Sequence, residues 1–337
     1  MDKVKQYTPG ILVAAGVGAV AILANGLIPY DLIGANVFAL LLGMLLNPLV
    51  SRYNLFNKGI NFVSSKVLRT GIVLMGITLS FAQVLQVGKY ALFLMAFTLL
   101  TAFGGGYLIG RLFKVNWKLS SLLSVSTAIC GGSAVAAVGP TIEAEDRDIA
   151  YAISATFIFD IITVIAFPWI GRLLGMNDTS FGLWVGTAVN DTSSVVAAGY
   201  GFSDIAGNLA VIVKLTRTLF IVPVVLIFGY INARVSAKQG GTLTKGKVDI
   251  KKIFPWFIIL FLVMVGIKST GLVPQAAVTG ISSASKLFMI MALGAIGLKT
   301  SFKEIKNAGI KPMIVGVIID TSVVFVALGA QALIGTL

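Results

Sequence analysis

The chain has 337 residues, of which 57% are hydrophobic and only 12% are charged, and its mean hydropathy is +0.96. Soluble domains contain about a quarter charged residues, so this composition places most of the chain in a lipid bilayer. The formal charge is +13, but the basic residues cluster between apolar runs, which is typical of membrane topology and excludes a nucleic-acid-binding surface. A single cysteine, Cys130, excludes an internal disulfide framework, and the lack of histidine disfavours a zinc site.

About 20 apolar residues cross a bilayer as a helix. Hydrophobic runs predict eleven such spans, near residues 8–28, 31–50, 60–82, 88–110, 119–139, 149–171, 180–201, 206–231, 253–268, 273–298 and 309–335. With the N-terminus in the cytoplasm, eighteen of the 26 Lys and Arg residues lie on the inner side and three on the outer side, as the positive-inside rule requires. We therefore expect an all-α, multi-pass membrane protein with its C-terminus outside.

Three pairs of similar segments indicate an internal repeat. KVLRT (66–70) matches KLTRT (214–218), LLLGMLLNP (40–48) matches LWVGTAVND (183–191), and FIFDIITV (157–164) resembles VIIDTSVV (317–324). The matches relate spans 2–6 to spans 7–11, so the two halves have opposite orientations, which predicts the inverted repeat of many secondary transporters. The predicted organisation is an extra N-terminal helix (1–30), a first repeat (31–175) and a second repeat (176–337).

A fourth match does not fit this repeat. TAICGGSAVAAVG (127–139) aligns with TAVNDTSSVVAAG (187–199) at an offset of 60 residues. These segments belong to spans five and seven, which share one orientation. Convergence of small-residue packing helices and a true relationship are both open readings of this match.

Glycines in the fifth span mark a candidate substrate site. Gly131 and Gly132 lie near the middle of this span, and its predicted counterpart, the tenth span, contains LGAIGLKT (293–300). Such glycines either let helices pack closely or let the backbone open, so that free N–H groups near Ser133 face an anion. The second alternative makes span five an interrupted helix, with Cys130 and Ser133 beside the substrate.

Two pairs of cations lie within predicted spans: Lys66 with Arg69, and Lys214 with Arg217. A charge at the centre of a spanning helix costs about 3 kcal/mol on insertion scales. Snorkelling to the membrane surface is one explanation. The other is a binding site, because i, i+3 spacing places both cations of a pair on one helix face. The predicted repeat would bring all four cations to one midplane cavity that binds an anion.

The intramembrane acids Asp160, Asp191 and Asp320 are either structural ion-pair partners or ligands for a coupling ion. A buried carboxylate binds a proton or helps to coordinate Na⁺ together with hydroxyl and carbonyl oxygens. The polar run NDTSS (190–194) forms either a cavity wall or hydrogen bonds between helices. The predicted coupling-ion residues are Asp160, Asn190, Asp191, Thr192, Ser193 and Asp320, and Na⁺ is the only cofactor that they suggest.

At these residues the chain resembles the YeiH, or putative sulfate exporter, family of bacterial inner-membrane proteins, part of the wider cation/proton antiporter and anion transporter superfamily. The resemblance covers nearly the whole chain and includes LLGMLLNP (41–48), KVLRTGIVLMG (66–76), STAICGGSAVAA (126–137), VGTAVNDTSSVVAAG (185–199), KLTRT (214–218), PWF (255–257) and ALGAIGLKT (292–300). It implies an inverted-repeat transporter with crossing, interrupted helices in spans five and ten. Many members have His-Glu where this chain has Asn190-Asp191, so histidine-based proton coupling is not expected here.

Together these features predict a secondary transporter for a small anion, such as sulfate, a sulfonate or a carboxylate, that works by alternating access and is coupled to Na⁺ or H⁺. A membrane subunit of an ion-pumping complex, such as a decarboxylase-linked sodium pump, and an anion channel are the alternatives. An enzyme is not expected from a chain without histidine or a cluster of metal ligands. The expected partners are the anion and the lipid bilayer, without nucleic acid, and a homodimer is an open alternative.

Overall fold

The computed structural model describes residues 2–27, 35–238, 253–300 and 310–336, and its regular elements in these ranges are all helices. The all-α prediction is therefore confirmed. The helices before the first interruption are α1 (Asp2–Leu27), α2 (Ala35–Val50), η1 (Asn54–Phe56), α3 (Asn57–Phe62), the π-helix η2 (Val63–Val67), α4 (Leu68–Met75), η3 (Gly76–Thr78), α5 (Phe81–Leu112) and α6 (Trp117–Ala128). They are followed by α7 (Gly132–Thr141), α8 (Asp146–Leu173), α9 (Asp178–Ala188), α10 (Thr192–Phe202), α11 (Asp204–Thr218), α12 (Ile221–Lys238), α14 (Phe257–Ser269), α15 (Gln275–Lys299) and α17 (Ile310–Leu333).

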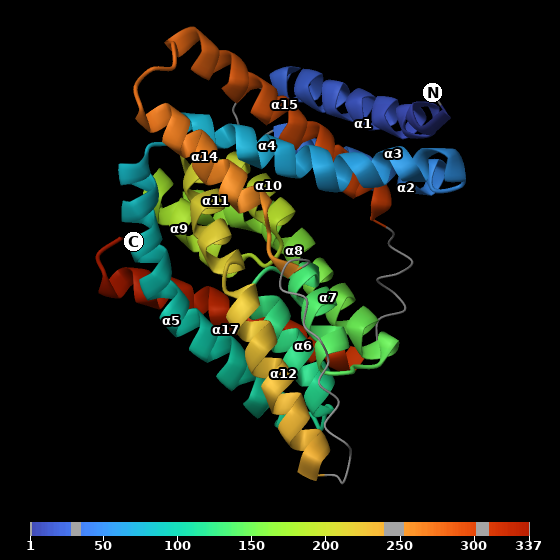
Figure 1. Ribbon diagram of the computed structural model, residues 1–337, viewed down its shortest axis with the longest axis vertical. Helices are drawn as coiled ribbons and strands as arrows, with labels where there is room; N and C mark the ends of the chain where they lie inside the picture. Colours follow the sequence, from blue (N-terminus) through green and yellow to red (C-terminus); the bar gives the residue numbers. More distant parts are fainter. Residues whose placement is uncertain (1, 28–34, 239–252, 301–309, 337) are drawn as a thin grey trace.

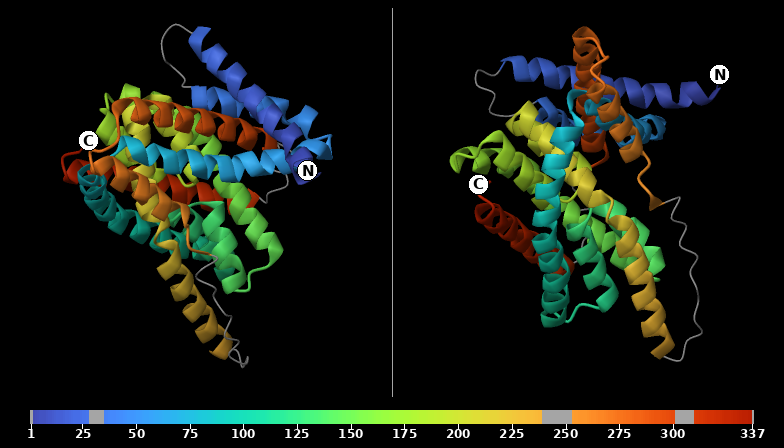
Figure 2. Two further views of the ribbon diagram at one scale, coloured as in Figure 1. Left: turned by 45° about the horizontal axis from the view of Figure 1, so that its top comes forward. Right: turned by 60° about the vertical axis from the view of Figure 1, so that its left-hand side comes forward.

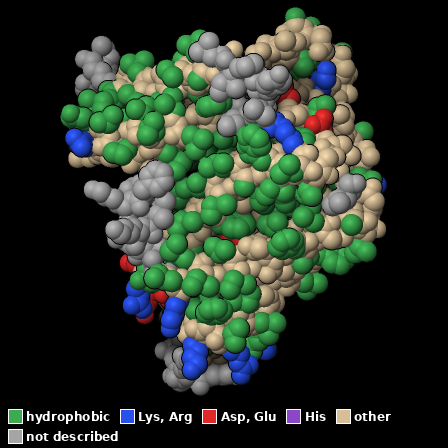
Figure 3. All heavy atoms as spheres, turned by 180° about the vertical axis from the view of Figure 1, so that it is seen from behind, with side chains coloured by type: hydrophobic (Ala, Val, Ile, Leu, Met, Phe, Trp, Pro, Cys, Tyr) green, Lys and Arg blue, Asp and Glu red, His purple; other side chains and the backbone are tan. Residues whose placement is uncertain are grey.

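Seven helical segments in the described part of the chain are long and apolar enough to cross a membrane, and two shorter apolar helices, α2 and α14, accompany them. The two remaining predicted spans, 119–139 and 180–201, are each divided into two half-helices, α6 with α7 and α9 with α10. Hydrophobic side chains cover much of the face shown in Figure 3, and Lys and Arg gather at its lower end. This is a multi-pass membrane protein, while eleven complete crossings remain a prediction.

The helices form two groups that lie at an angle to each other (Figure 1). The first helix group consists of α1, α2, the helices from η1 to η3, α14 and α15, which pack mainly on one another. The second helix group consists of α5 to α12 and α17. Figure 2 shows α1 and α15 of the first group crossing above the long helices of the second group. Both predicted repeats contribute helices to both groups.

The close contact of α2 with α15 explains the glycines of the tenth span. A Cβ atom at Gly297 would lie 2.1 Å from the carbonyl oxygen of Leu40, and one at Gly43 would lie 2.3 Å from the carbonyl oxygen of Gly294. These glycines allow two helix backbones to touch. Helix α15 is continuous from Gln275 to Lys299, so the interruption predicted in span ten is wrong.

The second interruption lies in span seven instead. Helix α9 ends at Ala188, and Asp191, in extended conformation, precedes the first residue of α10. In span five, α6 ends at Ala128 and α7 begins after Gly131, so the break predicted there is confirmed. The two interruptions correspond residue by residue at the offset of 60 that relates TAICGGSAVAAVG to TAVNDTSSVVAAG. This match therefore identifies both breaks, whereas the inverted repeat stays a prediction.

Candidate functional site

A cavity of about 1100 Å³ lies between the two helix groups. Its first wall comes from η2, α4, the start of α14 and the end of α15. Its second wall comes from α7, α8, the start of α10, the end of α11 and the start of α12. Small-molecule sites typically enclose about 300–1,000 Å³, so this cavity has room for a small solute and water. The second wall includes three residues with hydroxyl groups: Thr156, Ser193 and Thr218.

The first wall is cationic. Lys66 in η2, Arg69 in α4 and Lys299 at the end of α15 all line the cavity. The guanidinium carbon of Arg69 lies 5.7 Å from the centre of the Phe257 ring, a cation–π arrangement that fixes its position. In the described part of the chain, none of the three cations forms a salt bridge with a carboxylate. Lys66 belongs to a π-helix, a local distortion that is frequent at functional sites.

The N-terminus of α7 faces the cavity without a side-chain cap. Gly131 has φ +64° and ψ −136°, a conformation that favours glycine, and no side chain hydrogen-bonds the first turn of α7 as a cap. Gly132 and the exposed Ser133 both line the cavity. Helix N-termini carry a partial positive charge and unsatisfied N–H groups, so this end of α7 is suited to bind an anion.

The N-terminus of α10, by contrast, is covered by carboxylates. Asp160 from α8 accepts hydrogen bonds from the backbone N–H groups of Asn190 and Asp191, both at 3.1 Å. The carboxylate of Asp191 accepts the N–H of Ser193 at 2.8 Å and also its hydroxyl. Asp160 and Asp191 both line the cavity, so its second wall has an acidic region beside the α10 terminus.

Lys214 and Arg217 lie behind the second wall and do not line the cavity. Both are completely buried. Lys214 Nζ donates to the carbonyl oxygens of Ile129 at 2.7 Å and Val189 at 3.1 Å.

Arg217, one turn after Lys214 in α11, also donates to carbonyl groups at both interruptions. Its Nε donates to the carbonyl oxygen of Ala128 at 2.6 Å, and its Nη1 donates to that of Thr187. These carbonyls lie at the C-terminal ends of α6 and α9, where the helix dipoles are negative. The two cations therefore join the interruptions, and the structure does not bring them together with Lys66 and Arg69.

A buried polar cluster adjoins this region. Asp320 of α17 accepts hydrogen bonds from Thr127 Oγ1 at 2.5 Å and from Asn190 Nδ2 at 2.9 Å. Asn190 Oδ1 is buried and has no hydrogen-bond partner among the described residues. Within those residues, no group of three acidic, cysteine or histidine side chains converges as a metal site.

The structure thus divides the predicted site residues into two sets. The cavity is lined by Lys66, Arg69, Cys130, Gly132, Ser133, Asp160, Asp191, Thr192 and Ser193. The other predicted site residues do not line it: Gly131, Asn190, Lys214, Arg217 and Asp320. Sequence reasoning missed Lys299 and the aromatic side chains of Phe254, Trp256 and Phe257, although the motifs PWF and ALGAIGLKT include most of them.

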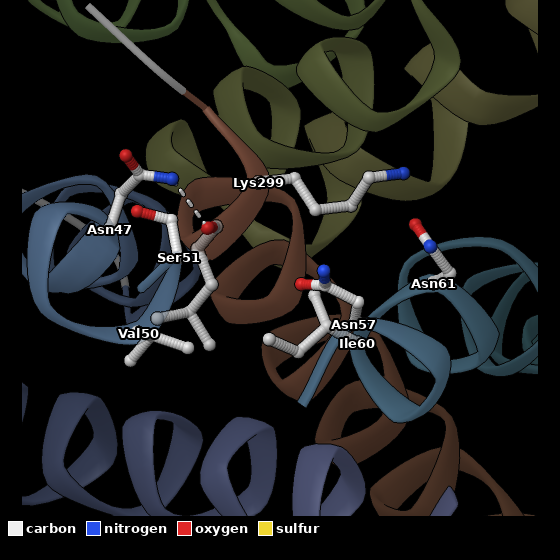
Figure 4. Close-up of a pocket in the computed structure, with 8 residues that line it drawn as sticks. Asn47, Val50, Ser51, Asn57, Ile60, Asn61 and Lys299 are labelled. Atoms are coloured by element: carbon white, nitrogen blue, oxygen red, sulfur yellow. Dashed lines mark hydrogen bonds between the residues drawn. The ribbon is translucent and has the colours of Figure 1, made fainter. Parts of the chain in front are cut away.

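A second pocket of about 240 Å³ is lined by Asn47, Val50, Ser51, Asn57, Ile60, Asn61, Leu298 and Lys299 (Figure 4). Asn47 Nδ2 donates to the carbonyl oxygen of Leu298 at 2.7 Å. The side chain of Lys299 extends along this pocket in the direction of Asn61. Since Lys299 also lines the large cavity, it links the two spaces.

Comparison with known proteins agrees with the family resemblance. The family model described as Conserved hypothetical protein 698 matches residues 9–316. The chain is 60% identical over 340 residues to a UPF0324 membrane protein of Clostridium tetani, covering 98% of this chain and 99% of that protein. It is 35% identical to the UPF0324 membrane protein SAG1125 of Streptococcus agalactiae (98% and 99% covered) and 36% identical to one of Streptococcus pneumoniae (99% and 99% covered).

Proposed function

The chain belongs to the Conserved hypothetical protein 698 family, and we propose that it is a secondary transporter that moves a small anion across the inner membrane. The observation that supports this most strongly is the cationic wall of the large cavity. Lys66, Arg69 and Lys299 face a solute-sized space and have no carboxylate partner in the described chain. Unpaired cations within membrane-spanning segments are costly, and an anionic ligand offsets that cost. Sulfate, a sulfonate or a carboxylate fits this chemistry.

Alternating access fits the arrangement of the helices. The cavity lies between two helix groups that pack mainly within themselves, so rocking of one group against the other would open it to either side. We propose that a coupling ion, Na⁺ or H⁺, binds at the buried polar cluster around Asp320 and Asn190. The partnerless Asn190 Oδ1 beside Asp320 supports a cation there, since oxygen ligands suit Na⁺.

The proposed orientation follows from the distribution of Lys and Arg, with the N-terminus in the cytoplasm and the C-terminus outside.

A transport role rather than a catalytic one is proposed, and a homodimer is compatible with it. A purified protein without partner chains that transports the anion would exclude a subunit of an ion-pumping complex. Turnover in proteoliposomes without single-channel currents in planar bilayers would exclude an anion channel.

The binding experiment is a thermal-shift titration of the purified protein with sulfate, ethanesulfonate and acetate. A ligand that binds only the folded state increases the free energy of unfolding by mass action, by about 2.7 kcal/mol at a hundredfold excess over Kd, and so raises the unfolding midpoint. Arg69→Ala should remove this stabilisation, while Arg111→Ala, at an exposed position at the end of α5, should keep it. Wild-type affinity in folded Arg69→Ala would contradict the proposed site.

A further inference from the structure

The large cavity places an open anion-binding helix end next to an available carboxylate. We propose that the transported anion is one pole of a zwitterion, a small molecule that carries an ammonium group together with a carboxylate or sulfonate. This inference rests on the proposed anion transport and names the substrate class of the same site. The anionic pole faces the first wall and the α7 terminus, and the ammonium group binds Asp191.

The two walls differ in charge. The three cations of the cavity, Lys66, Arg69 and Lys299, all come from the first helix group. Its two carboxylates, Asp160 and Asp191, both come from the second helix group. A ligand with a single negative charge complements only the first of these walls. A zwitterion complements both.

Asp191 has an oxygen available for an ammonium group. Its Oδ2 accepts the hydrogen bonds from Ser193, but no described residue donates to its Oδ1. Asp160 differs, because each of its oxygens already accepts a backbone N–H. An ammonium group brings three donors and binds a carboxylate by charge-assisted hydrogen bonds. Asp191 is therefore the acid that can meet a ligand without losing a structural contact.

The open helix end and this carboxylate adjoin each other. A Cβ atom at Gly131 would lie only 3.4 Å from the backbone nitrogen of Asp191. An anion at the first turn of α7 would therefore lie close to the Asp191 carboxylate, and like charges at such separations repel in a site of reduced dielectric. A zwitterion removes this conflict, because its ammonium group neutralises Asp191 while its anionic group uses the N–H groups of Gly132 and Ser133.

The test uses ligand pairs that differ only in the amino group: glycine with acetate, β-alanine with propionate, and taurine with ethanesulfonate. Binding to the purified full-length protein is measured by thermal shift and calorimetry in potassium buffer and again in sodium buffer. In potassium buffer we expect at least one amino compound to bind roughly tenfold or more tightly than its partner, equivalent to about 1.4 kcal/mol. Asp191→Asn should bring the two affinities of that pair together, and Arg69→Ala should weaken both.

The possible failures are distinguishable. Equal affinity within every pair, with binding intact, overturns the zwitterion and leaves the proposed anion transport standing. If none of these compounds and no sulfate binds, the proposed function itself falls. If the simple anions bind more tightly in sodium than in potassium, and Asp191→Asn abolishes that difference, Asp191 holds the coupling ion and the zwitterion is overturned. The pairwise comparison in the wild type decides the matter even if Asp191→Asn does not fold.

Discussion

The two interrupted helices, α6 with α7 and α9 with α10, have the same register but differ at the N-termini of their second halves. The C-terminal ends of the first halves, α6 and α9, have the same partners, because Lys214 and Arg217 each donate to a carbonyl oxygen at both ends. At the following N-termini, α10 has Asp160 and Asp191 as partners, whereas α7 has no side-chain cap. The positive N-terminus of α10 is thus neutralised by carboxylates of the protein, whereas that of α7 is open toward the cavity.

The difference separates structural from functional charge. A helix terminus has a partial charge of about half an elementary charge, and a buried N–H without a partner costs about 1–3 kcal/mol. Where the protein itself supplies the opposite charge, as at α10, the arrangement stabilises the fold. Where it does not, as at α7, a ligand is the natural partner. Four predictions test this distinction, beginning with the largest expected effect.

Arg217→Ala should cause the largest loss of stability. It leaves the buried carbonyls of Ala128 and Thr187 without their donors, which we expect to cost about 3 kcal/mol in the free energy of unfolding. The measurement is the thermal midpoint in detergent. Arg111→Ala is the control, because Arg111 is exposed and bonds only to the Tyr107 hydroxyl among the described residues. An unchanged midpoint combined with lost anion binding would make Arg217 an anion ligand instead.

Asp160→Asn should have the next largest effect. An asparagine amide can accept one of the two backbone N–H groups, but its NH₂ group cannot accept the other. Loss of this cap should destabilise the protein by about 2 kcal/mol and speed hydrogen exchange of the Asn190 and Asp191 amides, which immediately precede α10. Asp146→Asn at the exposed start of α8 is the matched control. Unchanged exchange of these two amides would show that Asp160 does not stabilise this terminus.

Gly131→Ala tests the open break itself. With φ at +64° and ψ at −136°, Gly131 adopts a positive-φ conformation that residues with a side chain rarely adopt, at a cost of about 1–3 kcal/mol. We expect a lower thermal midpoint for this variant. Gly104→Ala in α5 should be neutral or slightly stabilising, because Gly104 is helical and a Cβ atom there would meet nothing within 4 Å. If both variants behaved alike, the backbone at the break would not require glycine.

Most of the fold could be predicted from hydrophobicity alone. Each of the eleven apolar runs contains helix, because a bilayer leaves few other ways to satisfy the backbone. The position of the second break could not be derived in the same way. Glycine is ambiguous, since Gly131 opens a helix, while Gly294 and Gly297 allow α15 to pack on α2 without any interruption. Among the sequence features, the match at an offset of 60 residues is the one that indicates a break in span seven.

The site was predicted in part for a similar reason. The sequence identifies Lys66 and Lys214 as intramembrane cations in nearly identical motifs, yet one lines the cavity and the other binds carbonyls behind it. The partners that decide between these roles, Ile129 and Val189, are backbone groups distant in sequence. Lys299 was missed because its place at the cavity depends on where α15 ends against η2 and α4. Such contacts become visible only in three dimensions.

Ser133→Asp should change stability least and binding most. A carboxylate at the second position of α7 complements the positive helix end but also lies near the Asp191 carboxylate, so the two effects oppose each other and the thermal midpoint should change little. The same carboxylate would occupy the place of the anion, so ligand stabilisation in the thermal-shift titration should disappear. Ser194→Asp, in the first turn of α10, adds a charge where Asp160 and Asp191 already lie and should not stabilise. Lost binding together with a nearly unchanged midpoint at Ser133 is expected only if the α7 terminus is open for a ligand; a variant that binds normally would show that the anion lies elsewhere.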